Sequence, residues 1–242
     1  MKRTIVETED GSKTIHIADW NESYHSIHGA VQEAYHVFIK NGLNLFLNQY
    51  KAINILEIGL GTGLNAFITM LEAEKNHIKI NYVGVEKYPV SEEEFSVINY
   101  FDDVFKFYPE FENRKEEFLN YYLKMFSCTW EEEHIISDYL TIKKLEKDFF
   151  DLKGNVDERF DLVYFVADDL HVEDGVWFQI RPEIIHQITG LAVYLGFGKG
   201  IGEGAVGKVF FAEERIIAFV RQRGIKCAVV LNGDYLICPK IA

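Results

Sequence analysis

The chain has few cysteines and no long apolar run. Its three cysteines, Cys128, Cys227 and Cys238, are odd in number and scattered among 242 residues, which argues against a disulfide framework. No apolar stretch approaches the roughly 18 residues that a membrane helix needs. No apolar signal region follows Met1 either. We therefore expect a cytoplasmic protein that does not enter a membrane.

Basic residues are also scarce. There are 25 lysines and arginines against 38 aspartates and glutamates, so the formal net charge is −13. Because affinity for phosphate groups comes from lysine and arginine, this excess of acid argues against a nonspecific nucleic-acid binder. It leaves open an enzyme that receives RNA through one local basic patch, and equally an enzyme with a small-molecule substrate.

The most informative stretch is an apolar run, Ile53 to Ile58, followed by a glycine turn and a helix pattern. The helix is predicted by four apolar residues at the spacing i, i+3, i+4, i+7, namely Leu64, Phe67, Ile68 and Leu71. The turn holds Gly59, Gly61 and Gly63, and glycines allow a tight turn on which a ligand lies against bare backbone. The free N–H groups of the following helix would face that ligand.

The acids beside this turn indicate which ligand it binds. A dinucleotide fingerprint is G-x-G-x-x-G, one residue longer than the spacing here. Glu57, just before the turn, would repel a pyrophosphate and suits S-adenosylmethionine, which has an ammonium, a sulfonium and no phosphate. Glu86 closes the next apolar run, where an acid is expected to hold ribose hydroxyls. The pattern favours a class I methyltransferase over a nucleotide-binding relative or a structural turn.

Turn signals near both ends of the chain predict hairpins. Asp10-Gly11 separates two alternating segments, 3–8 and 13–17, and Asn232-Gly233 separates the apolar runs 225–231 and 235–238. A hairpin joins antiparallel strands. We therefore predict an α/β fold: a class I methyltransferase Rossmann-like sheet, mostly parallel with an antiparallel C-terminal strand, plus a small N-terminal β-hairpin arm.

The chain divides, on this interpretation, into an arm and one large domain. Residues 1–50 form the N-terminal hairpin and helical arm packed on the core. Residues 51–242 form the S-adenosylmethionine-binding domain, with a mostly helical insertion near 100–134. Ser91-x-x-Glu94 predicts a capping-box helix start. A short strand is expected to end near Asp138, a helix to run from about 141 to 150, and a buried strand from 160 to 167.

Two weaker motifs compete with this interpretation. The segment Gly202 to Lys208 matches G-x-x-x-x-G-K, but Val209 stands where a phosphate-binding loop needs Ser or Thr for magnesium. His25 and His28 are three residues apart, yet no cysteine or acidic cluster completes a zinc-like set. We therefore expect a flexible loop in the first case and no metal site in the second.

Several segments together resemble the bacterial tRNA 5-methylaminomethyl-2-thiouridine methyltransferases. They include Tyr24-His25-Ser26, His36-Val37-Phe38-Ile39, Leu56 to Ala66, Glu86-Lys87-Tyr88-Pro89, Asp161 to Phe165 and Trp177. The resemblance covers about residues 1–165. It implies a stand-alone version of the methyltransferase half of a bifunctional wobble-uridine modification enzyme, which converts the 5-aminomethyl group of that uridine to methylaminomethyl.

The resemblance also implies roles for individual residues. S-adenosylmethionine is the cofactor, with no metal, and tRNA is the partner; oligomeric state is not implied. The cofactor residues expected are Glu57 at the methionine end, Gly59, Gly61, Thr62, Gly63 and Asn65 at the turn, Glu86 at the ribose, and Lys87 next to it in the sequence. Asp138 is expected beside the adenine, or else as the N-cap of a helix. Tyr24, His25 and Glu33 are expected to line the acceptor pocket, or else to pack the arm on the core.

The last third of the chain departs from that family. The family has Asp-Ala-Phe after the fourth strand, where this chain has Val166, Ala167 and Asp168. Because ligands bind at the carboxyl ends of strands, Asp168 and Asp169 are the candidates for aligning the acceptor amine and taking its proton, or else both are loop caps or surface acids. Two alternatives stay open: a methyltransferase for a small amine, and a noncatalytic S-adenosylmethionine-binding relative.

Overall fold

The computed structural model describes most of the first two thirds of the chain and several strands beyond. The described residues are 2–19, 22–25, 29–40, 42–47, 49–148, 151–152, 160–167, 188–196, 228–231 and 234–237. The strands are β1 (Arg3–Glu7), β2 (Lys13–Ile17), β3 (Glu22–Ser23), β4 (Ala52–Ile58), β5 (Lys79–Glu86), β6 (Glu133–Ile135), β7 (Leu140–Glu146), β8 (Phe160–Ala167), β9 (Ile188–Gly196), β10 (Ala228–Leu231) and β11 (Asp234–Ile237). The α-helices are α1 (Ala30–Ala34), α2 (Leu64–Asn76), α3 (Glu92–Ile98), α4 (Phe101–Phe105) and α5 (Lys115–Ser127). Tyr35–Lys40 is π-helical, and Leu43–Leu45 and Pro109–Arg114 are 3-10 helices.

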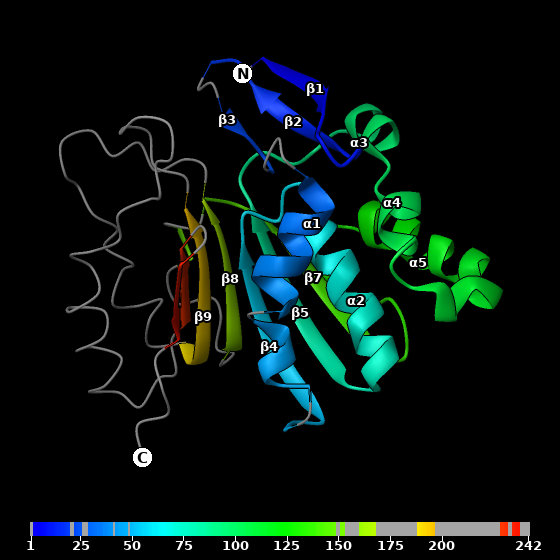
Figure 1. The fold of residues 1–242 in the computed structure, drawn as a ribbon, viewed down its shortest axis with the longest axis vertical. Coiled ribbons are helices and arrows are strands. Elements are labelled where there is room, and N and C mark those ends of the chain that lie inside the picture. Colours follow the sequence, from blue (N-terminus) through cyan, green and yellow to red (C-terminus); the bar gives the residue numbers. More distant parts are fainter. Residues whose placement is uncertain are drawn as a thin grey trace.

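The main sheet has six strands in the order β6-β7-β5-β4-β8-β9 (Figure 1). From β7 to β9 the neighbours are parallel, and β6 runs antiparallel to β7. The chain places β5 and β7 on one side of β4 and then β8 and β9 on the other, so the strand order reverses at β4. Ligands of such sheets bind outside the carboxyl ends of the strands at this point. The predicted mostly parallel, Rossmann-like sheet is confirmed.

Both predicted hairpins are present. β1 pairs antiparallel with β2 across the turn at Asp10-Gly11, and the short β3 extends this ribbon into a three-stranded sheet. β10 and β11 pair antiparallel, with Leu231 opposite Asp234, and β10 lies beside β9. Within the described residues, the antiparallel strand hydrogen-bonded to the main sheet is β6, whereas β10 and β11 form a two-stranded sheet of their own.

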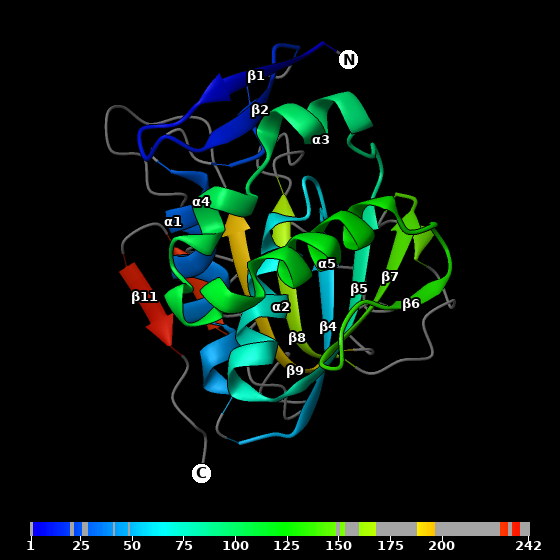
Figure 2. The same ribbon diagram turned by 90° about the vertical axis from the view of Figure 1, so that its right-hand side faces the viewer.

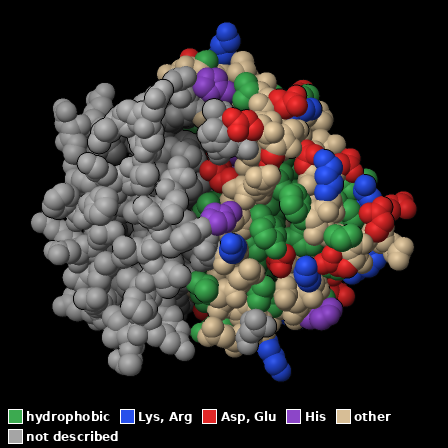
Figure 3. Space-filling model, in the orientation of Figure 1, with side chains coloured by type: hydrophobic (Ala, Val, Ile, Leu, Met, Phe, Trp, Pro, Cys, Tyr) green, Lys and Arg blue, Asp and Glu red, His purple; other side chains and the backbone are tan. Residues whose placement is uncertain are grey.

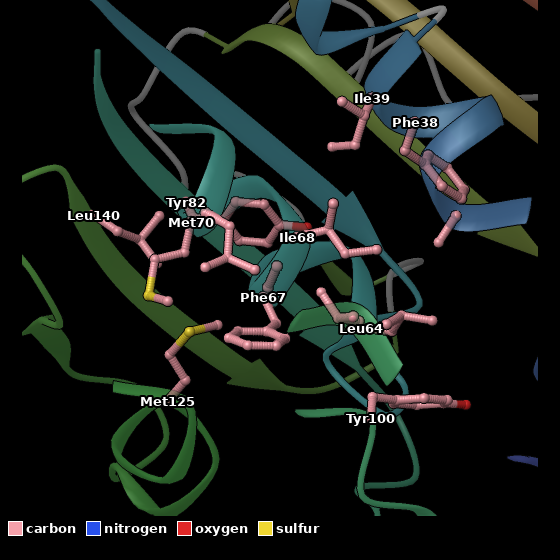
Figure 4. Packing of buried hydrophobic residues seen from close by; sticks show 14 of the residues in the cluster. Phe38, Ile39, Leu64, Phe67, Ile68, Met70, Tyr82, Tyr100, Met125 and Leu140 are labelled. Carbon is pink, nitrogen blue, oxygen red and sulfur yellow. The ribbon is translucent and has the colours of Figure 1, made fainter. Parts of the chain in front are cut away.

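Helices α1, α2 and α5 lie on one face of the main sheet (Figures 1 and 2). All four residues that predicted α2 are buried, and Phe67 packs on Tyr122 of α5 with ring centroids 4.6 Å apart. Figure 4 shows side chains of α2, of the sheet and of the π-helical segment Tyr35–Lys40 meeting in one core. Residues on both sides of the predicted boundary at 50/51 belong to this cluster; the division into two domains stays a prediction.

Two local predictions about helices have opposite outcomes. Ser91 caps α3 in a capping box with Glu94, as predicted. The helix predicted from about 141 to 150 is wrong, because Leu140–Glu146 is strand β7, paired with β5 along its length. The predicted insertion near 100–134 is mostly helical, as α4, the 3-10 turn at Pro109–Arg114 and α5, before the chain enters β6.

Gly84 lets the glycine turn pack closely on β5. A Cβ at this position would lie 2.7 Å from Cδ1 of Leu60, a turn residue that is 7% exposed. We therefore expect Gly84→Ala to lower the free energy of unfolding by about 2 kcal/mol, in the range measured for overpacked cores. Urea denaturation measures this loss. In a Leu60→Ala background the same substitution should cost much less; an equal cost in both backgrounds would rule out the clash as its cause.

Candidate functional site

The glycine turn lies at the carboxyl end of β4, at the reversal of strand order. Gly61 and Gly63 have φ values of +52° and +75°, a left-handed conformation that side chains with a Cβ rarely adopt. The N–H groups of Gly59 and Leu60 both donate to the Val85 carbonyl, which joins the turn to β5. No side chain caps the start of α2, so its first N–H groups face the turn. The N–H groups of Gly59, Leu60, Gly61 and Gly63 are thus taken within the protein, and the uncapped N–H groups at the start of α2 are the donors left for a ligand.

Glu86, the last residue of β5, reaches this turn. Its Oε2 accepts from the Gly61 N–H at 2.8 Å, and its Oε1 accepts from the Tyr88 N–H at 2.7 Å. The side chain is half-buried at the carboxyl edge of the sheet. A carboxylate is an acceptor only. The Glu86 carboxylate is therefore suited to bind ligand groups that donate a hydrogen bond, such as hydroxyls.

Lys87 and Asp148 bring the ends of two neighbouring strands together. Lys87 Nζ lies 2.9 Å from Asp148 Oδ2, a residue just beyond β7, and this contact raises the pKa of Lys87. The Lys147 N–H donates to the Glu86 carbonyl at 3.0 Å. The cofactor role of Lys87 stays a prediction, and sequence reasoning missed its contact with Asp148, because it assigned residues 141–150 to a helix.

Glu57 lies in the core beneath the turn. It is fully buried, and its oxygens accept from Asn65 Nδ2 at 2.8 Å and from the Tyr82 hydroxyl at 2.7 Å. Burial raises the pKa of Glu57 to about 8, against the lowering effect of these two hydrogen bonds. The carboxyl is therefore mainly neutral at pH 7. Glu57 and Asn65 hold the strand to the helix from within and do not present their paired atoms at the surface of the turn.

Two of the predicted acceptor residues lie against the glycine turn. His25 is 6% exposed, and its Nε2 lies 3.2 Å from Thr62 Oγ1. The Tyr24 ring packs over Gly61, because a Cβ there would lie 3.4 Å from the ring. Burial lowers the pKa of His25 to about 4, so its imidazole is neutral at pH 7. Glu33 lies half-buried on α1; its acceptor role stays a prediction.

Asp138 does not lie at the predicted place. It is exposed in the loop before β7, and Leu140 of β7 pairs with Ile80 at the start of β5. Asp138 is therefore at the amino ends of these strands, whereas Glu86 is at the carboxyl end of β5. Because β7 is parallel to β5, the acid near the carboxyl edge of the sheet is Asp148, and the reason for assigning Asp138 to the adenine is removed.

The other predicted positions fall beyond the described residues. Asp168 and Asp169 follow Ala167, the last residue of β8, and lie outside them. The same holds for a further set of segments, namely His28, Trp177, Lys199-Gly200 and Gly202 to Lys208. Val166 belongs to β8, where its backbone pairs with that of Leu195.

A cavity of about 400 Å³ opens beside the turn, between α2, α3, α5 and β7. Gly61, Thr62 and Gly63 line one side, and Trp130 and Lys144 line the other. The Lys144 Nζ donates to the carbonyl of Phe126 in the last turn of α5 and lies 4.9 Å from the centre of the Trp130 ring. Lys144 thereby stabilises the end of α5.

No group of three or more His, Cys, Asp or Glu in the described part of the chain could hold a metal ion. Across the same residues, no helix has the length and apolar character that crossing a membrane requires.

Comparisons with known proteins point to one group. No known family profile matches the chain. It is 36% identical over 111 residues to the tRNA 5-methylaminomethyl-2-thiouridine biosynthesis bifunctional protein MnmC of Leptospira borgpetersenii serovar Hardjo-bovis (strain JB197), covering 43% of this chain and 16% of that protein. It is 38% identical over 95 residues to the protein of the same name from Burkholderia mallei (strain SAVP1), covering 38% of this chain and 14% of that protein.

One solved structure has a similar fold. The crystal structure of MNMC2 from Aquifex aeolicus superposes with a TM-score of 0.52 at 24% identity, over 69% of this chain and 50% of that chain. At that identity the likeness concerns the fold. The matched part of our chain spans only about a sixth of the curated relatives, 16% of the first of them. Over that part, the chain is related to the tRNA 5-methylaminomethyl-2-thiouridine biosynthesis bifunctional proteins, and the resemblance predicted from the sequence is confirmed.

Proposed function

We propose that this chain is an S-adenosylmethionine-dependent methyltransferase that N-methylates the 5-aminomethyl group of tRNA wobble (2-thio)uridine in the cytoplasm. The observation that carries the proposal is the contact of Glu86 with the Gly61 N–H at the carboxyl edge of the sheet. A pyrophosphate on this turn would need that donor and would be repelled by the carboxylate. A ribose, whose hydroxyls donate, fits it. The relatives named for tRNA 5-methylaminomethyl-2-thiouridine biosynthesis support the choice of substrate.

The residues of this chain would act mainly by orientation. When bound, S-adenosylmethionine supplies a methyl group carried on a sulfonium. Glu86 and the Gly59 to Gly63 backbone would hold the cofactor, and holding two reactants in line contributes most of the rate in such transfers. Glu57, buried and mainly neutral at pH 7, adds little negative charge at the turn, so repulsion of a pyrophosphate would come from Glu86 and not, as the sequence suggested, from Glu57. Asp168 and Asp169, directly after β8 in sequence, remain our candidates for aligning the amine and taking its proton.

A small-amine methyltransferase is the second candidate. The net charge of −13 favours it. On the face drawn in Figure 3, the Lys and Arg side chains of the described residues are scattered among Asp and Glu rather than gathered in one patch. A noncatalytic cofactor-binding relative is a third candidate, because Val166 stands where the family has an aspartate.

The test is methyl transfer from labelled S-adenosylmethionine to tRNA from cells that lack this methylation step. We expect incorporation at the wobble uridine, and none into fully modified tRNA. Activity should fall steeply with salt, because tRNA binding releases counterions. Incorporation into a small amine alone, with little salt dependence, would favour the second candidate. Cofactor binding in the same preparation without turnover on either acceptor would favour the third.

A further inference from the structure

The first part of the N-terminal arm consists of β1, β2, β3 and the following Tyr24 and His25. It contacts both the glycine turn and the loop after Glu86, the two loops proposed to hold the cofactor. We propose that this arm is a clamp that sets the geometry of the glycine turn, with His25 as a positioning residue acting through Thr62. The inference rests on the proposed function, because it concerns how the same turn receives S-adenosylmethionine. It replaces the expectation that His25 touches the methyl acceptor.

His25 is held from the arm and bonded to the turn. Its backbone N–H donates to Thr14 Oγ1 of β2 at 2.9 Å, and its Nε2 lies 3.2 Å from Thr62 Oγ1. The ring also packs edge to face on Tyr100, with centroids 5.9 Å apart. At 6% exposure the imidazole has little surface left for a substrate. Its contacts therefore connect the arm to the residue between Gly61 and Gly63.

Tyr24 covers the turn at the neighbouring residue. A Cβ on Gly61 would lie 3.4 Å from Cδ2 and 3.7 Å from Cε2 of the Tyr24 ring. The ring thus lies within van der Waals range of the Gly61 Cβ position and covers bare backbone there. Gly61 is also the residue whose N–H donates to Glu86. Packing from the arm and the hydrogen bond from β5 together fix the orientation of this peptide.

Arg3 joins the same arm to the loop after Glu86. Its Nη1 donates to the Pro89 carbonyl at 3.2 Å and to Glu94 Oε2 at 3.1 Å, and its Nη2 donates to the Tyr88 carbonyl. Its guanidinium lies 5.5 Å from the centre of the Tyr24 ring. The arm therefore spans the loop after β4 and the loop after β5, and a turn held from outside is preorganised for its ligand.

A buried, neutral histidine suits this task beside a cationic cofactor. Because burial lowers the pKa of His25 to about 4, the imidazole keeps one donor and one acceptor nitrogen throughout the physiological range. It can bond the threonine hydroxyl without placing a positive charge near the sulfonium. A glutamine can offer a similar polar atom near the position of Nε2, whereas alanine cannot.

The test is a double-mutant cycle on S-adenosylmethionine affinity, measured by calorimetry. We expect His25→Ala and Thr62→Val each to raise the dissociation constant about tenfold, the expected size for one hydrogen bond. The double variant should also lose about tenfold rather than 100-fold, because both changes remove the same contact. His25→Gln should stay within about twofold of wild type. The KM for the acceptor, measured in His25→Ala with saturating cofactor, separates this role from one in the acceptor pocket, and we expect it to match that of the wild type.

A matched control lies in the same arm. His16 Nδ1 is 3.2 Å from Ser23 Oγ, a histidine–hydroxyl contact of equal length that joins β2 to β3. His16→Ala should leave cofactor affinity within about twofold. Additive losses for His25 and Thr62, or an unchanged dissociation constant in His25→Ala, would overturn the clamp. A higher KM for the acceptor with unchanged cofactor affinity would return His25 to the acceptor pocket.

The clamp and the proposed function can fail separately. If the wild-type protein binds no S-adenosylmethionine, the proposed function is wrong, and amide hydrogen exchange of the ligand-free protein still tests the clamp. We then expect faster exchange at Thr62, Gly63 and Leu64 in His25→Ala than in wild type or His16→Ala. Equal exchange in all three proteins would contradict it.

Discussion

Glu86→Ala is expected to weaken the binding of S-adenosylmethionine about 100-fold. The Glu86 carboxylate is placed at the turn by its bonds to the N–H groups of Gly61 and Tyr88. In the proposed complex it would accept from ribose hydroxyls, and a hydrogen bond to a charged group contributes about 1.5 to 3 kcal/mol. A net loss of about 3 kcal/mol corresponds to about 100-fold in the dissociation constant. Titration calorimetry measures it.

Two further variants separate cofactor binding from a structural effect. Glu86→Gln keeps one acceptor oxygen and should lose only about tenfold, since it gives up the charge but not the shape. Glu93→Gln, on the exposed first turn of α3, should bind like wild type. Circular dichroism checks that Glu86→Ala is folded. A folded Glu86→Ala protein with wild-type affinity would remove this residue from the cofactor site.

Glu57→Gln is expected to make the protein more stable at alkaline pH. The folded-state pKa of Glu57 is about 8, above its ordinary value of 4.5. Between these values the folded state holds a proton that the unfolded state has lost, so stability falls as the pH rises through this window. Above pH 8 the folded protein carries a buried charge at a cost on the order of 5 kcal/mol. Glutamine does not titrate and avoids this cost.

Urea denaturation at pH 5, 7 and 9 measures the difference. The variant should be close to wild type at pH 5 and more stable than wild type at pH 9. A glutamine amide can also donate, and the Asn65 Oδ1, which is buried without a hydrogen-bond partner, is available to accept after reorientation. Glu93→Gln is again the control, because that side chain is exposed. An equal loss of stability at every pH would contradict a neutral Glu57.

Local patterns in the chain were sufficient for the elements that begin or end on a strong signal. The alternation at 3–8 and 13–17 with Asp10-Gly11 between them predicted β1 and β2. Ser91 and Glu94 predicted the start of α3. Such signals are reliable because the turn or cap is made by residues within four positions of one another.

The prediction of a helix at 141–150 was wrong because this segment has no such local signal. Ile142, Leu145 and Phe149 match a helical spacing, while Leu140, Thr141 and Ile142 alternate as a strand does, and a short apolar run does not decide between the two. Pairing with β5 decided it. The acid at the carboxyl edge of the sheet is therefore Asp148 and not Asp138, since a residue's place at a strand end depends on where that strand lies in the sheet.

The sequence alone predicted the glycine turn, the acid before it and the acid that ends the next strand. Each of these features is recognised from its residue type and from its spacing along the chain. The charge of Glu57 could not be predicted in this way, because it depends on burial beneath α2 and on Tyr82, 25 residues away. Nor could the clamp, since His25 and Thr62 are 37 residues apart. Burial and long-range contact are properties of the packed molecule, and they determine which predicted side chains face the ligand and which support the turn from behind.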